Sequence, residues 1–192
     1  MNLPPKINSE TAKYSSVFMN LRYDTRNSFI NPSRGLVVQA EGEYAPSFEF
    51  TNSSFTRLAA TVQHYSILFY PKTVLALRLN FQGLIGNDLP VQTLLSIGGN
   101  NTLRGYPQDR FLDKISAVAN AELRFPIYWR FGGVAGIDLG RVWNKFSNIS
   151  FNNWARNPIF GLRFYMDTFI VRVDVGLGKE TTGFYFNFGQ VF

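Results

Sequence analysis

Residues 116–125 read Ser-Ala-Val-Ala-Asn-Ala-Glu-Leu-Arg-Phe, and this stretch decides the fold. Its even-numbered positions carry Ser116, Val118, Asn120, Glu122 and Arg124, whereas the odd-numbered positions carry only Ala, Leu and Phe. Alternation with a period of two over ten residues is the signature of a β-strand that has one polar and one apolar face. A tilted strand needs ~9–11 residues to cross a bilayer. The stretch therefore predicts a strand long enough to span a membrane.

The same alternation recurs along the chain and predicts about nine strands. They are expected near 15–24, 35–45, 55–69, 73–86, 114–126, 131–143, 157–166, 168–178 and 183–192. Short turns (Tyr70-Pro71-Lys72, Tyr128-Trp129-Arg130 and Met166-Asp167-Thr168) alternate with long connections (46–54, 87–113, 144–156 and 178–183). Short turns at one end and long loops at the other are typical of an outer-membrane barrel whose short turns are periplasmic. The longer link Thr25–Arg34 is expected at the periplasmic end too.

Composition favours a barrel in lipid. Aromatic residues make up 16% of the 192 residues and charged residues only 17%, and no run approaches the ~18 apolar residues of a membrane helix. An aromatic-rich soluble β-sandwich is the alternative. We expect an all-β, antiparallel transmembrane β-barrel of about 8–10 strands at residues 15–192. A lead segment is expected at 1–14 and an inserted extracellular loop at 87–113.

The strand count predicts that the chain is the C-terminal portion of a larger barrel. Bacterial barrels have even strand numbers, since both chain ends lie in the periplasm, and nine strands would start the first one outside. A true count of eight or ten is the alternative. Residues 1–6 also lack the apolar core of a secretory signal.

Charge and motif content exclude several function classes. The net charge of +6 comes from scattered Lys and Arg, so no nucleic-acid partner is expected, although cations at the rim can meet acidic lipid headgroups. Cysteine is absent, which removes disulfides and thiolate metal sites. His64 and Ser66 share one strand face, the arrangement of a membrane-embedded lipolytic pair, but no positioned acid or oxyanion donor accompanies them. We expect no enzyme, no cofactor and no metal.

The polar segment 96–110, SIGGNNTLRGYPQDR, separates two alternating stretches. Gly105 allows a tight backbone, and the guanidinium of Arg104 can reach away from it beside the ring of Tyr106. The segment closely resembles the loop motif of the BamA/TamA-like outer-membrane assembly factors, the bacterial surface antigen family. The resemblance implies that this loop folds back into the lumen of the barrel.

Other stretches resemble the same family in the expected order across residues 15–192. They are Tyr23–Asn27 with Asn31–Gly35, Asn120–Pro126, and Gly136–Gly140. The resemblance implies an acidic partner for the loop arginine, and strand parity turns both Asp138 and Glu122 inward. We expect Arg104 to meet Asp138 first and Glu122 second, because an unpaired charge in a crowded lumen would cost a few kcal/mol. The alternative is an external Arg104 and two ordinary solvated carboxylates.

The last segment, residues 184–192, places Phe184, Phe186, Phe188 and Phe192 on one face by strict alternation. It resembles the C-terminal recognition strand, or β-signal, of outer-membrane proteins. A terminal strand with one aromatic face and free backbone groups is suited to pairing with another strand edge.

The family resemblance implies an integral outer-membrane barrel that inserts, assembles or translocates proteins. A weakly closed strand edge would template incoming strands while the loop holds the wall in shape. The implied partners are membrane lipid, unfolded outer-membrane proteins or a translocated passenger, and subunits of the assembly machinery. A passive pore or lipid-export barrel, and a barrel anchor that secretes an upstream effector domain, are the alternatives.

Overall fold

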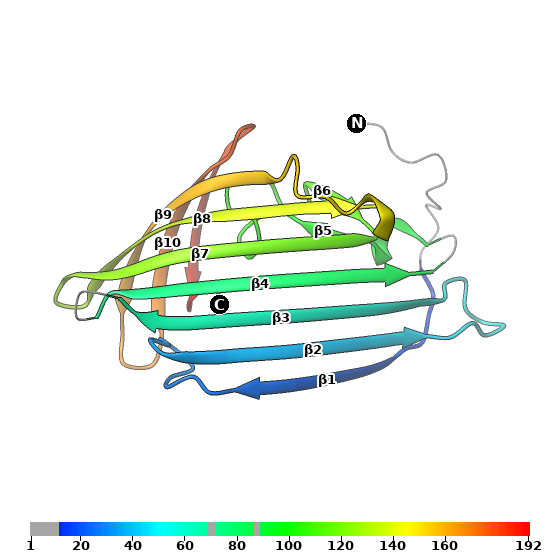
Figure 1. The fold of residues 1–192 in the computed structure, drawn as a ribbon, viewed down its shortest axis with the longest axis horizontal. Coiled ribbons are helices and arrows are strands. Elements are labelled where there is room, and N and C mark those ends of the chain that lie inside the picture. The colour runs from blue at the N-terminus through cyan, green and yellow to red at the C-terminus, as the bar shows by residue number, and fades with distance from the viewer. Residues whose placement is uncertain (1–11, 69–71, 87–88) are drawn as a thin grey trace.

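The computed structural model describes residues 12–68, 72–86 and 89–192. Most of the expected lead segment, the turn residues Tyr70 and Pro71, and the first two residues of the expected loop at 87–113 lie outside these ranges. Nine long strands form one antiparallel sheet that curves into a wall (Figure 1). They are β1 (Val17–Asp24), β2 (Gly35–Ala45), β3 (Phe55–Ile67), β4 (Val74–Ile85), β7 (Ile115–Tyr128), β8 (Phe131–Trp143), β9 (Ala155–Tyr165), β10 (Ile170–Leu177) and β11 (Thr182–Phe188).

The nine strands confirm the predicted all-β antiparallel fold, and each lies where the alternation placed it. Two short strands, β5 (Leu95–Ile97) and β6 (Phe111–Asp113), pair with each other inside the long loop. Two single 3-10 turns, at Val91–Thr93 and Phe146–Asn148, complete the elements. Within the described residues, no helix has the length and apolarity to cross a membrane.

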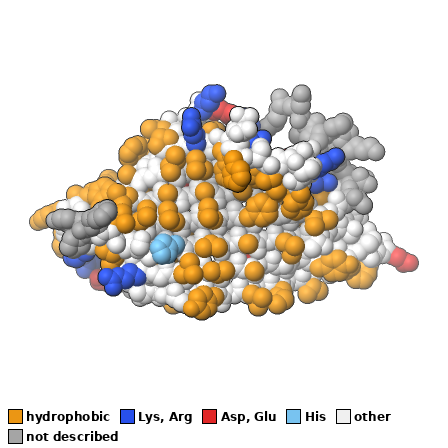
Figure 2. Space-filling view, viewed as in Figure 1, with side chains coloured by type: hydrophobic (Ala, Val, Ile, Leu, Met, Phe, Trp, Pro, Cys, Tyr) orange, Lys and Arg blue, Asp and Glu red, His pale blue; other side chains and the backbone are white. Residues whose placement is uncertain are grey.

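Side-chain alternation gives the wall two different faces. In the pairing of β7 with β8, Asn120 lies opposite Asp138 and Glu122 opposite Gly136, so polar positions of both strands share the inner face. The outer face carries exposed apolar side chains such as Leu79, which Figure 2 shows spread over the strands. An apolar surface this extensive is a contact surface for lipid rather than for water. Among the described residues the second sheet has only two strands, so no sandwich forms.

Connection lengths separate the two ends of the wall. The long loops leave the strands at the right of Figure 1, and the short turns lie at the left. The link Thr25–Arg34 lies at the short-turn end, and Thr25 N donates to Leu36 O at 2.9 Å to extend the β1–β2 hairpin. Within the described ranges, the outer edges of β1 and β11 pair with no strand.

The chain itself covers the inner face of the later strands of the wall. Loop residues 89–114 carry β5 and β6 against the inner side of β7 and β8. Apolar packing is divided into small clusters rather than one core. One of them holds Ile97, Leu103 and Tyr106 of the loop against Val118 of β7. This packing places the loop motif over the polar inner face of the wall.

Candidate functional site

The loop turns sharply before it reaches the wall. Gly98 and Gly99 both have positive φ (133° and 79°), a backbone conformation that residues with a Cβ atom rarely adopt. Gly98 N donates to Thr102 Oγ1 at 2.8 Å, and Gly99 N donates to Tyr106 O at 3.0 Å. These bonds close a compact loop whose tip presents Arg104 to the lumen.

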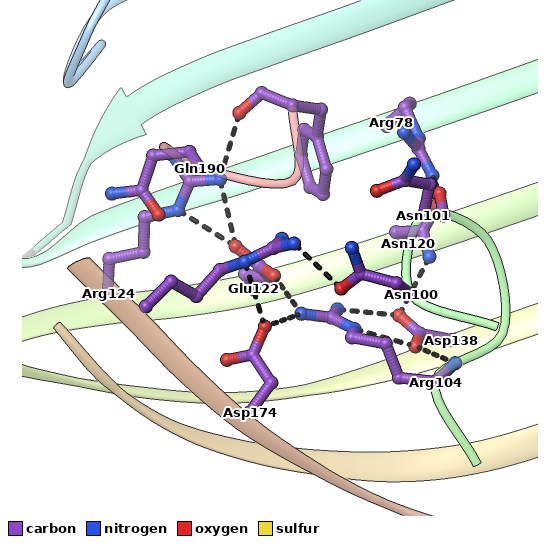
Figure 3. Close-up of polar contacts among 12 residues, drawn as sticks. Arg78, Asn100, Asn101, Arg104, Asn120, Glu122, Arg124, Asp138, Asp174 and Gln190 are labelled. Carbon is purple, nitrogen blue, oxygen red and sulfur yellow. Dashed lines mark hydrogen bonds and ion pairs between the residues drawn. The ribbon is translucent and has the colours of Figure 1, made fainter. Parts of the chain in front are cut away.

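Arg104 is fully buried against the inner wall. Its Nε and Nη2 donate to Asp138 Oδ2 and Oδ1 at 3.0 and 2.8 Å, and its backbone N donates to Oδ2 at 3.1 Å (Figure 3). Its Nη1 donates to Glu122 Oε1 at 2.6 Å. The planar guanidinium thus meets Asp138 bidentately, the strong geometry for such a pair. The structure brings together the three residues that parity and resemblance singled out.

A third carboxylate, which the sequence analysis missed, completes the arrangement. Arg104 Nη1 also donates to Asp174 Oδ2 of β10 at 3.2 Å, while Arg163 Nη1 donates to Asp174 Oδ1 at 2.5 Å. Asp174 follows Arg172 by two positions on the polar face of β10, so alternation carried a signal for it. Its approach to Arg104 depends on wall curvature, which strand parity alone does not give.

Basic side chains outnumber acidic ones here. We define the lumen cluster by its charged members: Arg78, Arg104, Arg124, Arg163, Arg172, Glu122, Asp138 and Asp174. Five guanidinium groups face three carboxylates, and neutral side-chain amides and backbone carbonyls accept further bonds from the guanidinium groups. Asn120, for example, donates to Asp138 Oδ1 at 2.7 Å and accepts from Arg78 Nε at 3.0 Å. This network joins the inner wall to the loop, although Arg124 Nη1, Arg163 Nη2, and Nε and Nη1 of Arg172 are buried without a hydrogen-bond partner among the described residues.

Glycines let the loop backbone approach the wall closely. A Cβ on Gly105 would lie 2.5 Å from Gly178 N and 2.6 Å from Asn157 Cβ, closer than real Cβ atoms come. A Cβ on Gly176 or Gly183 would likewise collide with the backbone of Arg104. The backbone of the motif therefore packs directly against the glycine backbone of β10 and β11.

Tyr106 fixes the other side of the motif. Its ring packs edge-on to Phe111, with centroids 5.3 Å apart, inside the cluster that includes Leu103. Its carbonyl oxygen accepts from Tyr185 Oη at 3.2 Å. The motif residues Arg104, Gly105 and Tyr106 thus contact three different surroundings: acids, glycine backbone and an apolar cluster.

The expected aromatic face of the last segment is only partly present. Phe184, Phe186 and Phe188 point outward with 68%, 59% and 67% exposure, but Phe192 is 9% exposed and lies inside. The prediction that Phe192 shares their face was wrong. Strand β11 ends at Phe188, and Gly189 adopts a φ of +83°, which breaks the alternation and turns the chain inward.

His64 and Ser66 lie on the outer face of β3, where alternate side chains point away from the lumen. Within the described ranges, His64 has no hydrogen bond or ion pair to another side chain. The pair lies on the opposite face of the wall from the lumen cluster.

Comparison with known proteins gives the family. The Omp85 superfamily domain matches residues 5–192. A structure titled as BamA from Haemophilus ducreyi lacking POTRA domains 1–3 is similar with a TM-score of 0.72 and 14% sequence identity. The match covers 90% of this chain and 41% of that one, so the chain spans less than half the length of that relative. No curated protein matches. The chain belongs to the Omp85 superfamily, and its fold is that of the BamA β-barrel.

Proposed function

We propose that this barrel inserts, assembles or translocates proteins at the outer membrane and catalyses no chemical reaction. The observation that carries the proposal is the burial of Arg104 among Asp138, Glu122 and Asp174, which holds the loop inside the lumen. The family resemblance of this loop links it to assembly factors rather than to barrels in general.

The mechanism follows from a contrast between a fixed wall and an open edge. Arg104 joins three strands, since Glu122 lies on β7, Asp138 on β8 and Asp174 on β10. The next strand, β11, has an outer edge that no described strand covers, with its backbone groups free to pair. Unpaired edges add further strands by main-chain hydrogen bonding. In this mechanism β11 templates an incoming strand while the loop keeps β7 to β10 in shape.

Lumen packing favours this function over a passive pore. The loop and the turned-in residues 189–192 lie on the inner side of the wall, and the polar groups of both bind side chains of the wall strands. A channel for solutes needs a water-filled lumen. The covered inner face of β7 to β10 supports a role in which the wall and its edge, rather than a pore, act on the client.

An insertion assay tests the proposal. The full-length protein that carries this barrel is reconstituted in liposomes, and folding of an unfolded outer-membrane protein is followed by protease protection. Arg104→Ala should slow insertion by about tenfold or more, the effect of about 1.4 kcal/mol. Arg22→Ala on β1 is the matched control and should retain the wild-type rate. Wild-type protein that opens a solute channel but speeds no insertion would contradict the proposal and favour a pore.

A further inference from the structure

Residues 189–192 leave the sheet and enter the lumen. Gly189 N donates to Ile170 O at 2.7 Å, and its positive φ turns the chain out of the strand that ends at Phe188. Gln190 then accepts from Arg163 Nε at 2.9 Å and donates from Nε2 to Asn31 Oδ1 at 3.3 Å. The segment is therefore held by side chains from both ends of the described sequence.

Phe192 fills a site whose parts match an aromatic residue. Arg124 Nη2 donates to the Phe192 carbonyl oxygen at 3.1 Å. The guanidinium carbons of Arg78 and Arg124 lie 5.0 and 5.1 Å from its ring centroid, within the range of cation–π attraction. The Tyr65 ring flanks it at 6.4 Å. We call this site the aromatic cage, with Tyr65, Arg78 and Arg124 as its polar and aromatic walls and Val37, Val74 and Ala76 as its apolar floor.

The cage is continuous with an open cavity. A cavity of 350 Å³ shares Val74 and Arg124 with the cage and extends past Trp129 and Asn31. Trp129 lies in the β7–β8 turn and Asn31 in the Thr25–Arg34 link, both at the short-turn end. A volume in the range of ~300–1,000 Å³ is typical of sites that admit small ligands or side chains. A segment of another chain can thus reach the cage from the end where short turns lie.

We propose that the aromatic cage is a binding site for an aromatic residue of an extended client polypeptide, and that Phe192 occupies it as an internal ligand. The inference rests on the proposed function for the identity of the client. The cage offers a main-chain hydrogen bond and two guanidinium faces for one ring, a combination that suits a peptide rather than a lipid tail. This chain's own residues 182–192 carry the matching groups, so a client segment of similar composition competes with Phe192.

Peptide binding to the full-length protein in detergent micelles tests the inference. The probe is a fluorescent peptide with the sequence of residues 182–192, and its control is the same peptide with the last Phe replaced by Ala. Phe192→Ala should bind the probe about tenfold more tightly than wild type if the internal ligand fills the cage nine-tenths of the time. Phe184→Ala, which removes an outward ring, should bind it as wild type does.

Cage variants make the test specific. Adding Arg124→Gln to Phe192→Ala should abolish the tighter binding, and adding Arg78→Gln, which keeps the Arg124–Glu122 pair, should weaken it several-fold. Equal affinities of wild type and Phe192→Ala, or equal affinities for the two peptides, would overturn the inference. If the wild-type protein binds the peptide as expected but does not speed client insertion, the proposed function, and not this inference, is overturned.

Discussion

Strands β1 and β7 belong to one sheet, yet their inner faces have different surroundings. Every residue from Val17 to Tyr23 is exposed, whereas β7 buries every second residue from Ser116 to Arg124. The loop and residues 189–192 cover the inner face of β7, and within the described residues nothing comparable covers β1. Burial in this wall is therefore set by what folds onto a strand, and not by the strand's own pattern.

The same difference separates two arginine–carboxylate pairs. Arg22 meets Asp24 on β1 at 2.8 Å with 42% of its side chain exposed, while the Arg104–Asp138 pair, also at 2.8 Å, is completely buried. Exposed pairs contribute about 0–1 kcal/mol. Removing one partner of a buried pair costs about 3–5 kcal/mol, because the other charge stays buried without compensation. Two ion pairs with the same N–O distance are therefore expected to differ in how much they contribute to the free energy of unfolding.

The largest expected effect comes from removing Arg104, the cation of the buried pair. Arg104→Ala leaves Glu122, Asp138 and Asp174 without their shared cation, so we expect the free energy of unfolding to fall by about 3–5 kcal/mol. Denaturant unfolding in micelles measures it, and protease cleavage near Gly105 should become faster. Arg22→Ala is the control, with a change below about 1 kcal/mol. Similar losses for both variants would refute the comparison.

A double-mutant cycle sharpens the comparison by isolating the pair. Arg104→Ala and Asp138→Ala should show a coupling free energy on the order of 1–3 kcal/mol, as contacting charges in a network do. The corresponding cycle for Arg22 and Asp24 should show much less, because water screens that pair. Strict additivity of the Arg104 and Asp138 effects would mean that the two side chains do not interact in the protein.

A substitution at Gly105 tests the close approach of two backbone segments, and its expected effect on stability is of similar size but involves no charge. Gly105→Ala forces Gly178 or Asn157 to move, and overpacking of this kind costs about 1–3 kcal/mol. At Gly42 on β2 the added Cβ would meet Leu58 Cδ2 at 3.7 Å, an ordinary contact. Gly42→Ala should therefore keep the wild-type unfolding midpoint. If Gly105→Ala does so too, the loop is not seated on the wall as described.

The smallest effect concerns an ion pair outside the membrane-spanning strands. Arg110 donates to Glu180 at 2.7 and 2.9 Å, and this hydrogen bond holds the pKa of the Glu180 carboxyl below its ordinary value. A depressed pKa stabilises the fold above pH 4.5 and loses that contribution as the pH falls through the lower folded value. Glu180→Gln should remove this part of the pH dependence of the unfolding midpoint. An unchanged pH profile would show that the pair has no net effect.

Much of the fold was predictable because alternation is local. The positions of nine strands, and the inward parity of Glu122 and Asp138, follow from residues that neighbour each other in sequence. Asp174 was not foreseen as a partner of Arg104, since 70 residues separate them and only the curvature of the wall brings them together. Parity says which face a side chain uses, but not which distant residue it meets there.

At Phe192 the alternation rule assigned the side chain to the wrong face. Alternation assigned it to the outer face because the rule assumes an extended backbone to the last residue. The strand ends at Phe188, four residues before Phe192, where Gly189 adopts a positive φ. The segment Gly189-Gln190 carried a warning in the sequence, because glycine in a strand pattern often marks a break.

Glu122 uses its two oxygens for two different partners. Oε1 accepts from Arg104 at 2.6 Å, and Oε2 accepts from Arg124 Nε at 2.9 Å, while Arg124 also binds the Phe192 carbonyl. One carboxylate thus stands between the loop and the aromatic cage, and any free energy by which one site alters the other must act equally in both directions. A ligand that displaces Phe192 and loosens the loop would, by the same amount, bind more tightly when the loop is loosened first. Arg78 provides a second link of this kind, since its Nη2 donates to Asn101 O of the loop and its guanidinium lies over the Phe192 ring.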